Sequence, residues 1–296
     1  MIVVPEFFAD RLVKMEPASR DWLDGLPELA ARYADRWQLR FDGAPMHGYG
    51  ALVLPAVRAD GTEVVLKLGW QTPETRDEPA ALAAWQGRGA VLLLDSDAEH
   101  GALLLERLDP ARSLDKHPIR EAERIIAELL RRLAIPAPPG ISRDLRTESE
   151  HWIEQLPKDF HRLGAPFPRI HLDAAVDICR QLGPTADHLL VNEDLHYENV
   201  LAGAREPWLV IDPQPIAGDL EFTMLSLLWN REHESDLAHR FATIVETAAL
   251  DPDKARAWTL VQCARNWLWF VEDEDYTDFG YAAVQTIMPW IFTHLP

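Results

Sequence analysis

The stretch Val191-Asn-Glu-Asp-Leu-His-Tyr-Glu-Asn-Val-Leu201 decides the fold class of this chain. It contains Asp194 and Asn199, and a second aspartate, Asp212, follows the apolar run 208–211. A carboxylate such as Asp194 can accept or orient the proton of an acceptor hydroxyl, and Asn199 and Asp212 offer the hard oxygen ligands that magnesium takes beside phosphates. A lone loop aspartate is usually a turn or cap residue, but these three groups in this order predict phosphoryl transfer.

The same order is typical of protein-kinase-like enzymes, in which D-x-x-x-x-N forms the catalytic loop and a strand ending in Asp forms the metal loop. The sequence before it is rich in β-forming residues. The runs 51–57 and 63–68 are joined by Asp60-Gly61, which predicts a hairpin. A helix is expected over 80–86, and two further strands follow it at 90–94 and 102–105.

Helical periodicity dominates from Pro110 onwards and also marks residues 20–38. The helices predicted in the later part are 118–134, 147–163, 172–182, 219–230, 234–248, 252–271 and 280–292, with a short strand at 208–211. We therefore predict an α+β, protein-kinase-like fold with two lobes. Residues 1–108 form a nucleotide-binding lobe with an N-terminal helix and a small antiparallel sheet. Residues 109–296 form a larger, mainly helical lobe with the catalytic loop, the metal loop and the acceptor site.

Lys67 is the predicted phosphate-binding lysine of the first lobe. It stands between apolar neighbours in a strand and shares a face with Val65; the alternative is an edge-strand lysine that prevents aggregation. Such a lysine needs a carboxylate on the following helix, and Glu78 is the first candidate. Because Pro79 follows it, Glu78 is expected at the helix start, which leaves Glu74 as the second candidate.

Two further segments are predicted to contact the nucleotide. Gly48-Tyr-Gly50 can form a turn whose amides approach phosphates, although two glycines beside a strand also mark ordinary hairpins. The run 103–108 leads into the expected hinge between the lobes. There we predict that adenine bonds to main-chain groups of Glu106 and Leu108.

Composition limits the partners. Forty-eight acidic against 29 basic residues give a net charge of −19, which argues against nucleic acid as a partner and suits a small cationic acceptor. An acidic surface is also common in soluble proteins.

No apolar run is long enough to predict a membrane span, and the start lacks a secretory pattern, so we expect a cytoplasmic protein. Cys179 and Cys263 are expected to be buried free thiols. No pattern indicates an oligomeric state.

An acidic run, 272–275, follows the aromatic segment 266–270. Carboxylates at a helix C-terminus oppose the helix dipole, so we predict that Glu272 and Asp273 contact a cationic acceptor. The alternative is a solvated helix end above a core-facing helix.

Two rival chemistries fit the sequence less well. Asp194 and His196 with Asp212 could form a metal-hydrolase cluster, but no second Asp/His pair has suitable spacing and Asn199 would be unexplained. Serine-nucleophile catalysis is weaker still, because the chain has no Gly-x-Ser-x-Gly elbow.

Motifs along most of the chain are similar to those of the aminoglycoside phosphotransferases, and more narrowly of the streptomycin 6-phosphotransferase/hydroxyurea kinase group. The segments that carry this resemblance are 4–9, 46–50, 52–55, 87–93, 101–108, 194–199, 211–215 and 218–219. The resemblance implies a two-lobed kinase-like fold, ATP with magnesium, and phosphate transfer to a hydroxyl of a small molecule, such as streptomycin in antibiotic resistance. It also implies that Asp194 is catalytic, that Asn199 and Asp212 bind the metal, and that Lys67 binds phosphates.

The chain departs from this family where His-Gly commonly precedes the catalytic aspartate, because Asn192-Glu193 occupies these positions. Glu193 adds a charge beside Asp194, and we predict that it raises the pKa of Asp194 or contacts a cationic acceptor. Two alternatives stay open: a kinase for another amino sugar or metabolite, and a nucleotide-binding regulatory protein with little catalysis.

Overall fold

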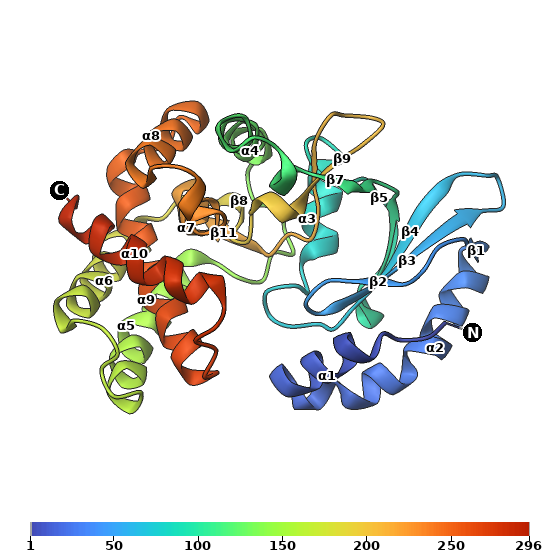
Figure 1. Ribbon diagram of the computed structural model, residues 1–296, viewed down its shortest axis with the longest axis horizontal. Coiled ribbons are helices and arrows are strands. Elements are labelled where there is room, and N and C mark those ends of the chain that lie inside the picture. The colour runs from blue at the N-terminus through green and yellow to red at the C-terminus, as the bar shows by residue number, and fades with distance from the viewer. Residues whose placement is uncertain (1, 296) are drawn as a thin grey trace.

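A six-stranded antiparallel sheet forms the core of the N-terminal part of the chain (Figure 1). The computed structural model describes residues 2–295. The strands follow the order β1-β3-β4-β6-β5, and β2 pairs with β3. Their bounds are β1 Leu39–Phe41, β2 Met46–His47, β3 Ala51–Arg58, β4 Glu63–Gly69, β5 Leu93–Asp97 and β6 Ala102–Glu106. The predicted hairpin is confirmed: Thr62 N donates to Asp60 Oδ1 (2.9 Å), and Gly61 has a φ of +86°.

Two N-terminal helices, α1 (Glu6–Met15) and α2 (Arg20–Arg36), cover the outer face of this sheet (Figure 1). The predicted helix at 20–38 is thereby confirmed. Alternation along the strands sends Leu52, Leu66 and Leu104 into the core beneath these helices. Lys67, beside Leu66 in β4, therefore belongs to the opposite face, which is turned toward the helical half.

The strand predicted at 90–94 is wrong in its bounds, because β5 begins only at Leu93. The apolar residues before it are used elsewhere. Ala90 forms an isolated bridge with Val210, and Val91 N donates to Val210 O at 2.8 Å. The segment therefore supports the strand that leads to Asp212.

All helices predicted for the later part are present, within a few residues of their expected ends. Their bounds are α4 Ile119–Leu133, α5 Leu145–Arg162, α6 Arg169–Leu182, α7 Met224–Trp229, α8 Leu237–Ala248, α9 Pro252–Glu272 and α10 Phe279–Thr293. Residues 220–223, predicted as part of a helix with α7, form a 3-10 turn. Together with the sheet, these helices confirm the α+β class and the kinase-like order of elements.

Short strand pairs carry the loops of the helical half. One small sheet has the order β10-β9-β7, from β7 Asp109–Ser113, β9 Val200–Ala202 and β10 Leu209–Val210. The other pairs β8 Leu189–Asn192 with β11 Pro215–Gly218. Of these strands only β10 was predicted, from the apolar run 208–211 that precedes Asp212.

The two halves share one core. A cluster of buried apolar side chains runs from the inner face of the sheet and α3 (Glu78–Trp85) through the helices of the second half. Trp85 Nε1 donates to Leu133 O at 2.9 Å, so α3 is fixed directly to α4. The chain leaves the sheet after Glu106; the division into lobes between residues 108 and 109 stays a prediction.

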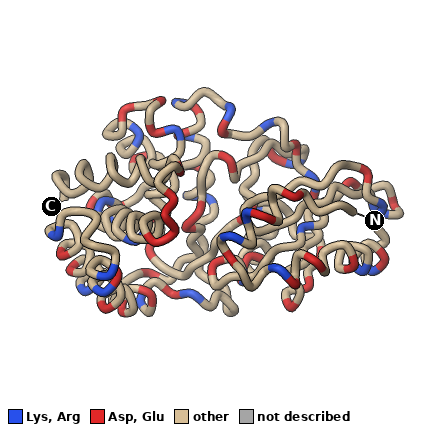
Figure 2. Tube along the Cα trace, turned by 60° about the horizontal axis from the view of Figure 1, so that its bottom comes forward, with Lys and Arg blue, Asp and Glu red and all other residues tan. Residues whose placement is uncertain are grey.

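The distribution of charged residues and the state of the two cysteines agree with the expectations from composition. Acidic positions lie on both halves of the molecule and outnumber the basic ones (Figure 2). Cys179 and Cys263 are buried and free, as predicted. Among the described residues, no helix is both long enough and apolar enough to cross a membrane.

Candidate active site

The loop with Asp194 and the loop with Asp212 are joined by one side chain, Asn192. This residue ends β8, and its Oδ1 accepts the amides of Asp194 (3.1 Å) and Gln214 (2.9 Å). Its own carbonyl accepts Thr223 Oγ1 at 3.0 Å. A buried amide oxygen bonded twice fixes both loops relative to each other, so Asn192 has a structural role at the position where the sequence departs from His-Gly.

Asp194, Asn199 and Asp212 line one cavity of about 560 Å³ between the two halves. Asn199 Nδ2 donates to the carbonyl of Asp194 (3.1 Å) and to its Oδ2 (3.3 Å), and Gln214 Nε2 approaches the same carboxylate at 3.4 Å. Ile211 N donates to Asn199 O at 2.9 Å, which holds the second aspartate beside the first loop. The structure thus brings the three predicted residues together.

Asp212 has a left-handed backbone, with φ of +52°. Aspartate tolerates this region better than most residues, whereas a β-branched residue would be strained there. The conformation turns the chain sharply at the end of β10.

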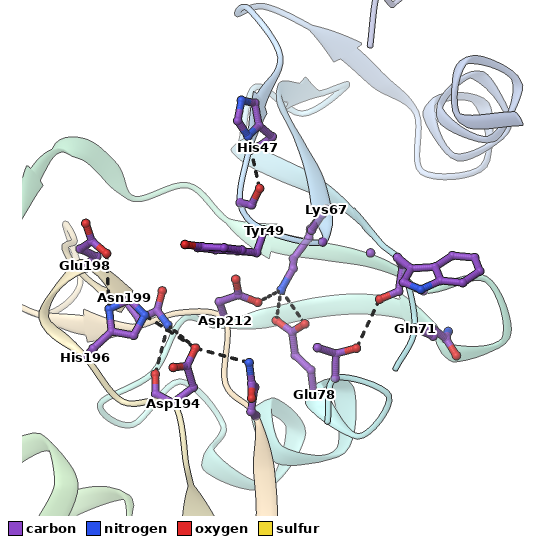
Figure 3. A pocket seen from close by; sticks show the side chains of 18 of the residues that line it. His47, Tyr49, Lys67, Gln71, Glu78, Asp194, His196, Glu198, Asn199 and Asp212 are labelled. Carbon is purple, nitrogen blue, oxygen red and sulfur yellow. Dashed lines mark hydrogen bonds and ion pairs between the residues drawn. The ribbon is translucent and has the colours of Figure 1, made fainter. Parts of the chain in front are cut away.

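Lys67 bridges two carboxylates (Figure 3). Its Nζ lies 2.6 Å from both oxygens of Glu78 and 2.6 Å from Asp212 Oδ1. The predicted contact with Glu78 is therefore present, and Glu78 is the first residue of α3, so Pro79 fits the first helical turn. Lys67 and Glu78 are buried, with 7% and 5% of their surface exposed.

Mutual attraction keeps Lys67 and Asp212 charged. Burial by itself would lower the pKa of Lys67, but the carboxylates of Asp212 and Glu78 raise it above its usual range. Burial would also raise the pKa of Asp212, yet the Lys67 ammonium holds it below its ordinary value. Glu78 differs, because burial raises its pKa to about 7 against the pull of Lys67. Asp212 is therefore ionised at neutral pH, as a cation ligand must be.

His196 lies between two acids. Its Nε2 is 3.6 Å from Asp194 Oδ2, and its Nδ1 is 3.7 Å from Glu198 Oε2. Burial would lower the pKa of His196, but Asp194 and Glu198 raise it. The rival metal-hydrolase cluster gains no support, since the only group in residues 2–295 with three such ligands close together is Asp97, Glu99 and His100, near the turn between β5 and β6.

The glycine-containing loop lies directly above Asp212. Gly48 and Gly50 both line the cavity, and Gly48 N donates to Ala51 O at 3.0 Å, closing a tight turn between β2 and β3. A Cβ added at Gly48 would stand 3.5 Å from Asp212 Oδ2. The loop is therefore placed to cover phosphates held near Asp212.

One of the main-chain groups predicted to bond to adenine at the hinge is already used within the protein. Glu106 N already donates to Leu92 O (3.0 Å), and its carboxylate accepts Leu92 N (2.7 Å). Neither Glu106 nor Leu108 is among the cavity-lining residues. The contacts of adenine with main-chain groups of Glu106 and Leu108 therefore stay a prediction, and the amide of Glu106 is already bonded.

Glu193 does not face the cavity. Its carboxylate pairs with Arg143 and lies 3.7 Å from Arg265, inside the helical half, with only 8% of the side chain exposed. Glu193 and Asp194 both lie in the turn that follows β8, where the Glu193 carboxylate is directed at these arginines while Asp194 lines the cavity. The expectation that Glu193 contacts an acceptor is corrected accordingly.

The other two predicted acceptor contacts also lie elsewhere. Glu272 pairs with Arg162 (2.9 Å), Asp273 is exposed at the end of α9, and neither lines the cavity. Glu198 and Asp278 line it instead. Asp278 caps α10 by accepting Gly280 N (2.6 Å), and an aspartate before a helical pattern was the available signal.

Aromatic and acidic side chains also line the cavity. We call six of them the outer wall: Tyr49, Glu198, Trp229, Trp269, Asp278 and Phe279. Burial and the nearby charges of Asp278 and Glu198 raise the pKa of Tyr49. Aromatic faces beside carboxylates favour organic cations, so the outer wall suits a positively charged small molecule.

Comparison with known proteins gives a consistent result. Residues 36–274 match the family described as aminoglycoside/hydroxyurea antibiotic resistance kinase. A hydroxyurea phosphotransferase from Kitasatospora aureofaciens is 44% identical, over 86% of this chain and 76% of that protein. A streptomycin 6-kinase from Streptomyces griseus is 42% identical, over 86% of each.

Solved structures agree on the fold. The choline kinase LicA from Streptococcus pneumoniae has a TM-score of 0.62 at 15% identity, covering 90% of this chain and 99% of that one. An aminoglycoside phosphotransferase, APH(4)-Ia, in complex with ADP and hygromycin B also has a TM-score of 0.62, at 12% identity, covering 89% of this chain and 97% of that one.

Proposed function

The chain belongs to the aminoglycoside/hydroxyurea antibiotic resistance kinase family, and we propose that it transfers the γ-phosphate of ATP, with magnesium, to a hydroxyl of a small cationic acceptor. The observation that carries this proposal is the convergence of Asp194, Asn199, Asp212 and Lys67 on one cavity. A phosphotransferase acts mainly by positioning and electrostatic stabilisation, and these four side chains supply both.

Each side chain has a defined task. Asp194 orients the acceptor hydroxyl and takes its proton. Lys67 binds phosphate oxygens and keeps them in line with that hydroxyl.

The metal donors fit magnesium. Asn199 and Asp212 present hard oxygen atoms on one side of the cavity, and Asp212 is ionised. When bound there, magnesium spreads the charge that develops on the phosphates. Gly48 leaves room above these ligands for the phosphate chain.

Streptomycin is the acceptor to test first. One relative is named a streptomycin 6-kinase, and the outer wall places Glu198 and Asp278 beside aromatic rings, where guanidinium groups can bind. Hydroxyurea is the second compound, since another relative is named for it. Because hydroxyurea is neutral and small, it would form no ion pair with the carboxylates of Glu198 and Asp278.

The test is an acceptor screen. The purified protein is incubated with ATP, magnesium and streptomycin, hydroxyurea or other amino sugars, and the product is analysed by mass spectrometry for one added phosphate group. The expected result is a phosphorylated cationic acceptor and its loss in Asp194→Ala. If no acceptor gains phosphate while ATP still binds, the regulatory alternative replaces this proposal.

A further inference from the structure

Helix α1 lies outside the segment 36–274 that matches the family, yet it reaches the cavity. Its residue Arg11 lines that cavity. Arg11 Nη2 donates to the carbonyls of Gly48 (2.6 Å) and Tyr49 (3.2 Å). The guanidinium also lies 4.2 Å from the centre of the Tyr49 ring. One side chain therefore holds two consecutive peptide groups and the aromatic ring between them.

These contacts decide where the loop amides point. In a trans peptide the carbonyl and the following amide face opposite directions, so the amides of Tyr49 and Gly50 point away from Arg11. The other polar groups of the turn are used: Gly48 N bonds to Ala51 O, and Gly50 O accepts Trp70 N at 2.8 Å. Among the described residues, the amides of Tyr49 and Gly50 have no acceptor.

The helix that carries Arg11 is firmly held. Phe8 is fully buried and stacks on His47 of β2, with ring centres 5.4 Å apart. Leu12, next to Arg11, is buried in the cluster under the sheet. Because α1 is anchored on both sides of its contact with the loop, Arg11 is in place before any ligand arrives.

We propose that Arg11 is a positioning residue of the nucleotide site, which fixes the carbonyls of Gly48 and Tyr49 so that the amides of Tyr49 and Gly50 receive phosphate oxygens. Consecutive amides with free hydrogens form a concave anion site, and a charged donor strengthens each carbonyl bond. Arg11 acts through the loop and is not itself a catalytic residue. The inference rests on the proposed function only in taking a nucleotide as the ligand.

The experiment compares Arg11→Ala, Arg11→Lys and the control Lys14→Ala, which removes an exposed charge from the same helix. Calorimetry gives the Kd for a non-hydrolysable ATP analogue with magnesium, and kinetics give KM for ATP and for the acceptor. We expect Arg11→Ala to weaken nucleotide binding about tenfold, or about 1.4 kcal/mol, with the Tm close to that of the wild type. The acceptor KM should change less than the nucleotide Kd, because Arg11 also stacks on Tyr49 of the outer wall. Arg11→Lys should recover part of the loss, because an ammonium reaches a carbonyl but cannot present a planar fork.

Two results would overturn the inference. One is wild-type nucleotide affinity in Arg11→Ala; the other is an equal loss of nucleotide and acceptor affinity with a lower Tm, which would indicate general support of the fold. Failure of the proposed function looks different: the wild type would bind nucleotide and phosphorylate no acceptor, and the Kd comparison would still decide the role of Arg11. A wild type that binds no nucleotide would overturn both.

Discussion

The two sides of the cavity are built differently. On the side of Lys67, the charged groups bond to one another: the ammonium holds Glu78 and Asp212, and Asn199 holds Asp194. On the outer wall, Tyr49 and Phe279 are 59% and 47% exposed and lie open to the cavity. The protein thus fixes the groups that phosphate chemistry requires by bonds among them, whereas Tyr49 and Phe279 of the outer wall remain largely exposed.

The largest effect is expected for a change at Asp194. This residue lies on the Lys67 side of the cavity, which we call the fixed side. Asp194→Ala should lower kcat by roughly 10²–10⁴-fold, the range for a lost general base, and leave ATP affinity near the wild-type value. Steady-state kinetics and calorimetry measure the two quantities separately. Turnover near the wild-type rate would remove Asp194 from its assigned role.

The next effect concerns stability on the same side. Lys67→Met leaves Glu78 buried without its cation, and breaking a buried pair in this way costs roughly 3–5 kcal/mol. Urea unfolding should show this loss, and nucleotide binding should fall with it. The exposed residue Lys158 provides the control: Lys158→Met should change neither. A Lys67→Met protein as stable as wild type would contradict the reading of the cluster.

Two glutamates test which acidic side chains contact the acceptor: Glu198 lines the cavity, and Glu193 is paired inside the helical half. Glu198→Gln should raise KM for a cationic acceptor by a few fold, since an exposed ion pair is worth up to about 1 kcal/mol, and should not affect stability. Glu193→Gln should do the reverse: it weakens the buried pair with Arg143 by roughly 1–3 kcal/mol and leaves the acceptor KM unchanged. An acceptor effect in Glu193→Gln would restore the role expected from the sequence.

A further expected effect is a dependence of stability on pH. The pKa of Glu78 is raised from 4.5 to about 7, so the folded state binds a proton more tightly than the unfolded state. Its contribution to stability is full below pH 4.5 and is lost as the pH rises through 7. Glu78→Gln should remove this part of the decline in unfolding free energy between these two values. An identical decline in both proteins would place the titration elsewhere.

The sequence predicted the fixed side well because its chemistry demands particular residue types at particular spacing. Asp194, Asn199 and Asp212 were found from order alone, and Glu78 from its place after the lysine strand. Which way a side chain faces was harder to predict. Glu193 was expected beside the acceptor because it adjoins Asp194, yet in the turn after β8 its side chain lies in the helical half, where arginines distant in sequence compensate its charge.

The outer wall and the N-terminal helix could not be predicted, for a different physical reason. Their residues come from distant segments, and nothing in the local pattern brings Tyr49, Trp229 and Asp278 together. Arg11 could not be singled out from the sequence, because its partners are main-chain carbonyls, which leave no trace in composition or spacing.

The attachment of α3 to the helical half has a mechanical consequence. Trp85 fixes α3 to α4 through Leu133, whereas Lys67 belongs to the sheet. Helix α3 also packs against β5 of the sheet, so it contacts both halves. The Lys67–Glu78 ion pair therefore joins β4 to a helix that both halves hold, and a pair of spectroscopic labels on β4 and α3 would report any movement between them.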